Sequence, residues 1–468
     1  MSTSLKKNFA YKGLLTLATP IMGMITFPYI SRVLGVENVG LVNFVDNTIN
    51  YFLLFATMGI GSLGVRSIAA VRGNQDELNK TFSNLLGLNL LFTLGTLLVY
   101  TLLITVVPKF NLNSELFYVG TAKILFTSLL VEWFFTGIEN FKYITIRTLL
   151  IRLIYIIAVF VFIRQANDYK LYFVLTTAVV VINAIINLCY SRKYVHIIPP
   201  ELISGRFLKE NATLGVYALM TSMYLTFNVM YLGLACNNTE VGYYTSAFKL
   251  YNLILSVFTA FTSVMLPRMS SLLSQGETDK FKEYINKSMA FVSLFSIPLI
   301  VCCSIMAPEI IYLLCGNGYE GAIMPMRIIM PAILFVGIAQ ILAIQVLMPL
   351  KKDKTLLLAS VLGAVMSLLI NIILVHKIQS IGSAIVLLSS EFIVTLTYII
   401  YTERKGIIKL NYSHLINPLL KTIPCALICL MCHRFIEGRI ISLLVAVVLS
   451  FAIYAVLSTR QFKNLINR

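Results

Sequence analysis

The sequence is poor in charged residues. Only 12% of its 468 residues are Asp, Glu, Lys or Arg, whereas 58% are hydrophobic, and the mean hydropathy is +0.85. A soluble protein of this length usually has about twice that charged fraction to cover its surface. The scarcity of charge therefore excludes an ordinary soluble protein and indicates a membrane protein.

Motifs for common enzyme chemistry are also missing. The sequence has no P-loop and no HExxH motif, and none of its four histidines falls in the middle of an apolar segment. GIGSLG (59–64) matches a dinucleotide-binding pattern, but it follows no predicted strand and lies in an apolar segment, which favours close helix contact. We therefore expect no enzyme activity and neither a metal nor an organic cofactor.

Cysteine is scarce, and seven of the eight cysteines fall in or beside apolar segments. Cys425, Cys429 and Cys432 share one helical face next to His433, a grouping that could bind a soft metal. Small side chains on one face also let membrane helices pack closely. We favour the packing interpretation.

Long apolar segments recur along the whole chain. Each has about 18 residues or more, the length of a helix that crosses the apolar core of a bilayer. We predict an all-α polytopic membrane protein with fourteen spans. The predicted spans are residues 14–31, 41–63, 83–107, 116–138, 146–164, 171–190, 213–235, 244–266, 288–312, 327–349, 355–375, 381–401, 415–433 and 440–458.

Positive charge is distributed unevenly between the predicted loops. Most of the 37 Lys and Arg residues fall on the side of the membrane that holds both termini, including Arg192, Lys193 and the lysines of 351–354. Cytoplasmic loops of membrane proteins carry such an excess. We therefore predict two cytoplasmic termini, and we attribute the net charge of +17 to orientation rather than to nucleic-acid binding.

A weak internal repeat divides the chain. A shift of 202 residues aligns two predicted spans without a gap, and the identical pairs are Val39/Val241, Gly40/Gly242, Asn50/Asn252, Leu53/Leu255, Thr57/Thr259 and Arg66/Arg268. Six spans per copy place both copies in the same direction, as in transporters that rock around a substrate between two lobes. The predicted domains are an N-terminal lobe (1–192), a cytoplasmic linker (193–212), a C-terminal lobe (213–402) and two extra spans (403–468).

A polar stripe marks the predicted span 41–63. Asn43, Asp46, Asn47 and Asn50 are spaced i, i+3, i+4, i+7, so they share one helix face. Lys249 aligns with Asn47 in the repeat. We predict that the stripe and Lys249 line a wet, cation-rich chamber between the lobes. The alternative is that these side chains only join helices, with Asp46 and Lys249 as a latch.

Further ionisable residues in or beside the spans extend this candidate site. A charge in lipid is costly unless it faces a cavity or a partner, and an excess of cations favours an anionic ligand such as phosphate. Arg147 could instead extend to the membrane surface. The predicted substrate-binding residues are Arg32, Lys123, Arg147, Arg152, Lys249, Asn47, Asn50 and Tyr244, and the predicted ion-coupling residues are Asp46, Glu132 and Glu391.

Four stretches carry a resemblance to a known family: PYISRVLGVENVG (28–40), WFFTGIENFKYITIR (133–147), VGYYTSAFKLYN (241–252) and MLPRMS (265–270). They resemble the polysaccharide transporter family of Wzx-type O-antigen and capsule flippases, which belongs to the multidrug and oligosaccharidyl-lipid exporter superfamily. The resemblance covers the length of the chain. It implies that Arg32 and Lys249 are substrate-site residues, since both lie in matching stretches.

The resemblance also implies a function. The expected substrate is an undecaprenyl-diphosphate-linked oligosaccharide, flipped by alternating access across the bacterial plasma (inner) membrane for lipopolysaccharide, capsule or a related polymer. Arg147 and Arg152 would recruit the head group, and Lys249, Lys123 and Arg32 would neutralise the diphosphate. H+ or Na+ is the expected coupling ion, and membrane lipids, a glycan polymerase and a chain-length regulator are expected partners.

Two other functions compete with this one. A multidrug or small-molecule exporter of the same superfamily should have a cavity dominated by carboxylates, whereas cations outnumber acids among the candidates here. A membrane glycan polymerase should have a large outer loop with catalytic residues, whereas every predicted outer loop is short. Both features favour the flippase.

Overall fold

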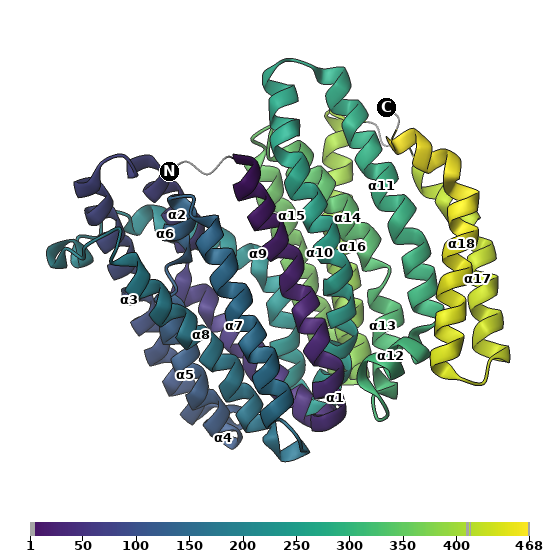
Figure 1. Cartoon of the computed structure of the whole chain (residues 1–468), viewed down its shortest axis with the longest axis horizontal. Helices are drawn as coiled ribbons and strands as arrows, with labels where there is room; N and C mark the ends of the chain where they lie inside the picture. Colours follow the sequence, from purple (N-terminus) through teal and green to yellow (C-terminus); the bar gives the residue numbers. More distant parts are fainter. Residues whose placement is uncertain (1–4, 409–410, 412, 467–468) are drawn as a thin grey trace. The chain divides into compact units, whose positions relative to one another are not determined.

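The computed structural model describes residues 5–408, 411 and 413–466, and all regular secondary structure in these residues is helical (Figure 1). The predicted all-α class is confirmed. The chain forms two compact units, Met1–Asn238 and Thr239–Arg468, called unit 1 and unit 2 below. The predicted boundaries of the lobes and the linker stay predictions.

Unit 1 is built mainly from antiparallel helices, and its last long helix, α9, packs against α1 and α2. The helices of unit 1 are α1 (Leu5–Thr57), α2 (Ile60–Val71), α3 (Gln75–Val106), α4 (Pro108–Leu112), α5 (Ser114–Ser128), α6 (Glu132–Gly137), α7 (Phe141–Phe162), η1 (Ala166–Asp168), α8 (Tyr169–Ser191), η2 (Pro199–Ile203) and α9 (Leu208–Ala235). Asn74 caps α3 because its side chain accepts hydrogen bonds from the backbone N–H groups of Asp76 and Glu77.

Unit 2 pairs α15 with α16 and packs the C-terminal hairpin, α17 and α18, against α11. Its elements are α10 (Asn238–Ser274), α11 (Thr278–Ile305), α12 (Ala307–Cys315), η3 (Glu320–Ala322), α13 (Ile323–Ile329), α14 (Ala332–Gln340), η4 (Ile341–Leu347), α15 (Asp353–Ile370), η5 (Asn371–Val375), α16 (His376–Arg404), α17 (Ser413–Phe435) and α18 (Arg439–Ile466). Segments η4 and η5 are π-helical, a geometry often found at functional positions.

The described helices account for all fourteen predicted spans. Eleven segments are long and apolar enough to cross a membrane. Two of them, Gly13–Thr57 and Asp353–Arg404, contain a kink and so cover two predicted spans each. α9 corresponds to the predicted span 213–235.

Residues with unusual backbone angles produce the two kinks. Gly35 has φ 74° and ψ 167°, which only glycine adopts without steric cost, so α1 turns there between its two spanning halves. In α16 the corresponding residue is Gln379, with φ 50° and ψ −123°. The long helices therefore fold back where the sequence analysis placed loops.

Two predicted spans are broken rather than continuous. The span 41–63 ends its first helix at Thr57 and restarts at Ile60, with Met58 at φ 39°. The span 116–138 is interrupted between α5 and α6, where Val131 has φ 40°. A left-handed β-branched residue is sterically unfavourable and persists only where the surroundings hold it. The prediction of continuous helices is wrong at both places.

An aromatic core stabilises the end of unit 1 that contains these breaks. Its buried members include Phe82, Trp133 and Phe134, which come from α3 and α6.

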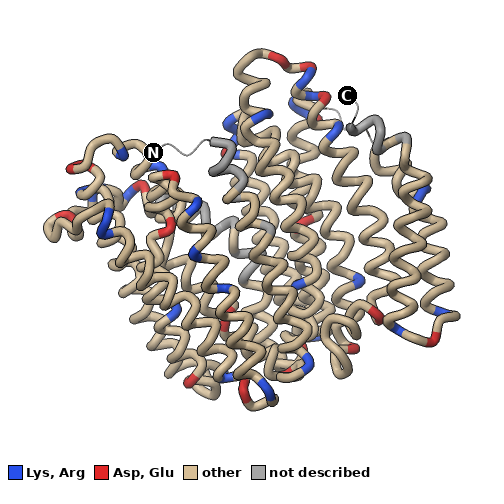
Figure 2. Tube along the Cα trace, viewed as in Figure 1, with Lys and Arg blue, Asp and Glu red and all other residues tan. Residues whose placement is uncertain are grey.

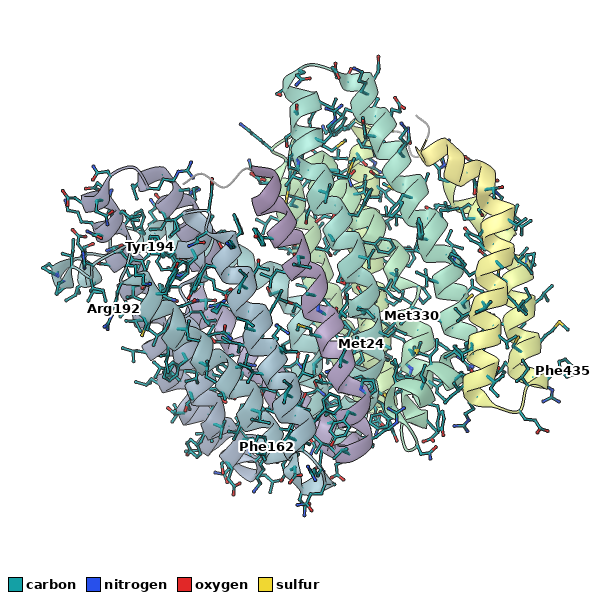
Figure 3. The ribbon with its side chains drawn as sticks, in the orientation of Figure 1. Met24, Phe162, Arg192, Tyr194, Met330 and Phe435 are labelled. Carbon is teal, nitrogen blue, oxygen red and sulfur yellow. The ribbon has the colours of Figure 1, made fainter. Side chains whose placement is uncertain are left out.

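In Figure 3, Phe162 at the end of α7 lies at the opposite end of unit 1 from Tyr194, as expected for helices that run antiparallel. Burial, aided by a hydrogen bond to Tyr190, raises the pKa of Tyr194 to about 12.

Charged residues lie mostly near helix ends within each unit (Figure 2). The long middle sections of the helices present apolar side chains, many of them exposed, such as Leu98, Ile154 and Val448. Exposed apolar side chains along spanning helices are what a lipid environment requires. The charged residues that do lie within spans are therefore the informative exceptions.

The cysteines of α17 are packing residues. Cys425, Cys429 and Cys432 are buried, and the Cys429 sulfur lies 3.6 Å from the sulfur of Cys302 on α11. His433 contacts Glu309 instead, with 2.5 Å between Nδ1 and Oε1. No group of three or more His, Cys, Asp and Glu in the described part of the chain is placed to hold a metal.

Candidate functional site

The polar stripe on the second half of α1 is largely tied to its own helix. The side-chain amides of Asn43 and Asn47 donate to the backbone oxygens of Val39 and Asn43, at 2.7 and 2.8 Å. Asn50 donates to Oδ2 of Asp46 at 3.3 Å. The carboxylate of Asp46 is therefore the group of this stripe that reaches another helix.

Asp46 forms an ion pair with Lys123 of α5. The Lys123 side chain is 12% exposed and that of Asp46 is 32% exposed, so water screens this pair less than a surface pair. The sequence analysis named both residues but did not pair them. Lys249 is a half-buried residue of α10 in unit 2, and its role with Asp46 stays a prediction.

A second ion pair joins α6 to α7. Nη2 of Arg147 lies 2.6 Å from Oε1 of Glu132, and it also donates to Oγ1 of Thr148 at 2.9 Å. Arg147 does not extend to the surface, because its side chain is only 5% exposed, whereas Glu132 is 48% exposed. The alternative interpretation, in which Arg147 extends to the membrane surface, is therefore wrong.

Arg147 retains unused hydrogen-bond donors. Its Nε and Nη1 are buried and have no acceptor among the described residues. A buried N–H group without an acceptor is costly, and a guanidinium favours paired oxygens such as those of phosphate. Arg147 is therefore the predicted residue whose geometry most clearly calls for an anionic partner.

Arg152 and two tyrosines lie close to these pairs. Arg152 is half-buried, five residues after Arg147 on α7, and it interacts electrostatically with Glu132 and Tyr155. Tyr155 is hydrogen-bonded to Tyr172 of α8 and lies within electrostatic range of Asp46. Unit 1 thus brings five charged residues into one polar region. We name this region the unit 1 charge cluster, and its members are Asp46, Lys123, Glu132, Arg147 and Arg152.

A cavity opens where the two broken helices meet. It has a volume of about 620 Å³ and is lined by both breaks, including Met58, Gly59, Val131 and Glu132. Asn89 of α3 also lines it and donates to the backbone oxygen of Ser128 at 2.9 Å. Broken helices line ligand or ion sites in many transporters, since irregular backbone is tolerated there. The unit 1 charge cluster borders this cavity through Glu132.

One glycine of the GIGSLG motif, Gly64, is needed for close helix packing in this region. A Cβ added at Gly64 would lie 2.7 Å from the ring of Trp133, so only glycine lets α2 approach α6 this closely. This supports the helix-contact interpretation of the motif. Sequence reasoning missed the cavity itself, although Gly59 and Gly61 inside the predicted span 41–63 were a usable signal for a helix break.

The other predicted site residues lie elsewhere. Arg32 is exposed near the Gly35 kink and donates to the backbone oxygen of Pro28 at 2.8 Å. In unit 2, Tyr244 is buried and stacks on Phe248, and Glu391 of α16 is 4% exposed. The structure therefore brings together the five predicted residues of the unit 1 charge cluster, with Asn50 hydrogen-bonded to Asp46 beside them. The substrate or coupling roles of all the predicted residues stay predictions.

The fold and the charges together define the class of protein. It is an α-helical protein with many membrane spans and with ion pairs between its helices. The family model described as "Polysaccharide biosynthesis protein" matches residues 5–273, and the chain belongs to that family. The resemblance drawn from the four sequence stretches is confirmed.

Relatives agree with this membership. The "Putative O-antigen transporter" of Escherichia coli (strain K12) is 25% identical over 415 residues, which cover 86% of this chain and 98% of the relative. The fold is similar to that of the lipid II flippase MurJ in an inward closed conformation, with a TM-score of 0.81, 14% identity and coverage of 97% of this chain and 99% of MurJ. An inward-facing MATE-family multidrug transporter of the MOP superfamily has a TM-score of 0.61 at 13% identity, over 84% of this chain and 98% of that one.

Proposed function

We propose that the protein flips a lipid-linked oligosaccharide across the membrane and that the unit 1 charge cluster binds the diphosphate of the lipid carrier. The family, the name of the Escherichia coli relative and the flippase-like fold support transport of a polysaccharide precursor. The observation that carries the proposal is the buried guanidinium of Arg147, in which two nitrogen atoms, Nε and Nη1, lack an acceptor among the described residues.

Binding would follow from charge and geometry. Nε and Nη1 of Arg147 offer donors to diphosphate oxygens, while Nη2 stays on Glu132. Arg152 supplies a second positive charge on the same helix. The cavity at the helix breaks has room for a polar head group, since ligand pockets of ~300–1,000 Å³ are typical. The polyprenyl chain would remain in the bilayer.

The carboxylates provide a means of coupling. Asp46 holds Lys123, so protonation of Asp46 or binding of Na+ to it would release the ammonium group to a diphosphate. Glu132 could act on Arg147 in the same way, and Glu391 is the corresponding candidate in unit 2. We propose H+ or Na+ coupling through these groups during alternating access.

Several finer assignments belong to the same proposal. An undecaprenyl diphosphate carrier, the bacterial inner membrane and both termini on the cytoplasmic side fit the sequence pattern and the relatives. A glycan polymerase and a chain-length regulator are the partners that such a pathway needs. The excess of cations over acids in the unit 1 charge cluster favours this substrate over the cationic drugs of a multidrug exporter.

The test is transport of a fluorescent lipid diphosphate oligosaccharide in proteoliposomes. Arg147→Ala should lower the initial rate about tenfold or more, the effect of losing one charge-assisted hydrogen bond. Arg72→Ala is the matched control, because Arg72 also pairs with a glutamate, Glu139 at 2.7 Å, but both side chains are half exposed. Equal rates for Arg147→Ala and wild type, at equal amounts of folded protein, would remove the diphosphate site from unit 1.

A further inference from the structure

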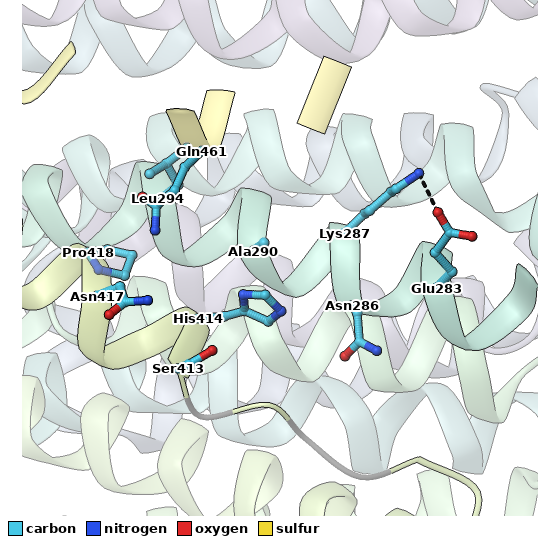
Figure 4. Close-up of a pocket in the computed structure, with 10 residues that line it drawn as sticks. All are labelled: Glu283, Asn286, Lys287, Ala290, Leu294, Ser413, His414, Asn417, Pro418 and Gln461. Carbon is cyan, nitrogen blue, oxygen red and sulfur yellow. Dashed lines mark ion pairs between the residues drawn. The ribbon is translucent and has the colours of Figure 1, made fainter. Parts of the chain in front are cut away.

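A polar cavity separate from the unit 1 charge cluster lies at one end of unit 2 (Figure 4). Its volume is about 410 Å³, and it is bounded by α11, the start of α17 and the end of α18. The polar side chains that line it include Glu283, Asn286, Lys287, His414, Asn417 and Gln461. Nothing in the proposed transport function uses this cavity.

The charged groups of this cavity balance each other. Lys287 and Glu283 form an ion pair of 2.8 Å, drawn as a dashed line in Figure 4. The Lys287 side chain is 23% exposed, whereas Glu283 is half exposed. A cavity that offers one cation and one anion suits a ligand that carries both signs of charge better than a simple anion.

Two amide oxygens at the cavity lack donors. Oδ1 of Asn286 and Oε1 of Gln461 are buried and have no hydrogen-bond partner among the described residues. They come from α11 and α18. A buried acceptor without a donor is unfavourable, and an ammonium group, which offers only N–H donors, could satisfy the amide oxygen of Asn286.

An apolar cavity continues from the polar one along α11. It has a volume of about 250 Å³ and shares Leu294 with the polar cavity. Its lining runs on along α11 through Cys302 and Cys303 and is completed by residues of α12, α17 and α18. Eight residues of helix span ~12 Å, close to the ~15 Å of one leaflet's apolar core. The polar cavity therefore matches the head group of a lipid, and the adjoining apolar cavity matches part of an acyl chain.

We propose that the two cavities hold one zwitterionic phospholipid with a primary ammonium group. The ammonium contacts the amide oxygen of Asn286, and the phosphate contacts Lys287 and His414. One acyl chain follows α11 between α17 and α18. This lipid is a resident that joins the C-terminal hairpin to α11, and it is distinct from any transported substrate.

Native mass spectrometry of the full-length protein tests the proposal. Phosphatidylethanolamine and phosphatidylglycerol with the same acyl chains are titrated separately, and soluble phosphoethanolamine is a third ligand. We expect phosphatidylethanolamine to bind about tenfold more tightly than either of the others, as one additional charge-assisted contact predicts. Equal binding of phosphatidylglycerol would refute the zwitterionic site, and equal binding of phosphoethanolamine would refute the lipid.

Two variants link the binding to this cavity. Lys287→Ala should weaken phosphatidylethanolamine binding about tenfold. Lys280→Ala should leave it unchanged, because Lys280 pairs with Glu277 at 3.0 Å on the same helix but does not line the cavity.

Asn286→Leu separates binding from folding. It removes an acceptor that has no donor, so it should weaken lipid binding while the melting temperature in lipid-free detergent stays equal or rises. Unchanged lipid binding by both Lys287→Ala and Asn286→Leu would place the lipid elsewhere.

Discussion

The two units stabilise their interiors by different polar contacts. Unit 1 uses charges between helices, Asp46 with Lys123 and Glu132 with Arg147. The middle of unit 2 uses neutral side chains, such as Ser288 with Gln345. Neutral hydrogen bonds position helices at low cost, whereas a buried ion pair must recover the cost of desolvating both charges through good geometry and further hydrogen bonds. The function proposed above uses the charges of unit 1, whereas the neutral contacts in the middle of unit 2 pack its helices together.

Glu132→Ala should produce the largest loss of stability. It leaves the 5% exposed guanidinium of Arg147 without its carboxylate, and an uncompensated buried charge costs about 3 kcal/mol or more. The measurement is the free energy of unfolding in detergent. Glu139→Ala is the control, because Glu139 is half exposed in its pair with Arg72. Equal stability of Glu132→Ala and Glu139→Ala would show that unit 1 does not depend on buried charge.

Asp46→Asn should have the second largest effect. It breaks the pair with Lys123, which is 12% exposed, and we expect a loss of about 2 kcal/mol, within the range for charged hydrogen bonds. The double variant Asp46→Asn, Lys123→Met should recover part of this loss in a double-mutant cycle.

Glu391→Gln tests the same contrast in unit 2. No ion-pair partner of Glu391 occurs in the described residues, so this change should leave the free energy of unfolding nearly unchanged. A larger loss for Glu391→Gln would reverse the contrast between the units.

The sequence predicted the spans better than the contacts between them. Apolar length located all fourteen spans, because the bilayer imposes that length on each segment separately. The sequence also singled out the five residues of the unit 1 charge cluster, since a charge in an apolar segment stands out. The pairing of Asp46 with Lys123 was not predictable, because it depends on how α5 is rotated against α1, 77 residues away.

The helix breaks show a second limit of local reasoning. Nothing in the residues around Val131 indicates a left-handed backbone, since valine disfavours it. The surroundings impose it: Asn187 of α8 donates to the backbone oxygen of Leu130, and α6 packs on Gly64. A break held by distant side chains leaves no signature in its own sequence.

Ser288→Ala should have a smaller effect than either change in unit 1. It removes the 2.8 Å hydrogen bond to Oε1 of Gln345, a fully buried residue of the π-helical segment η4. A neutral hydrogen bond contributes about 1 kcal/mol, so we expect that loss in the free energy of unfolding and no change in transport rate. Ser256→Ala is the control, because Ser256 donates only within its own helix. A transport defect in Ser288→Ala would give the neutral interior of unit 2 a role in substrate movement.

Arg66→Ala should have the smallest effect and so tests whether burial, rather than charge as such, distinguishes the pairs of unit 1. Arg66 of α2 pairs with Glu210 of α9 at 3.0 Å, but the two side chains are 67% and 58% exposed. Water screens such a pair, and its contribution is about 0–1 kcal/mol and falls with added salt. We expect a loss below about 0.5 kcal/mol that disappears in 0.5 M NaCl, whereas the loss in Glu132→Ala should persist at that ionic strength, ~3 times the physiological value. If the two variants lost equal stability and responded equally to salt, the stability of unit 1 would depend on the number of its ion pairs and not on their burial.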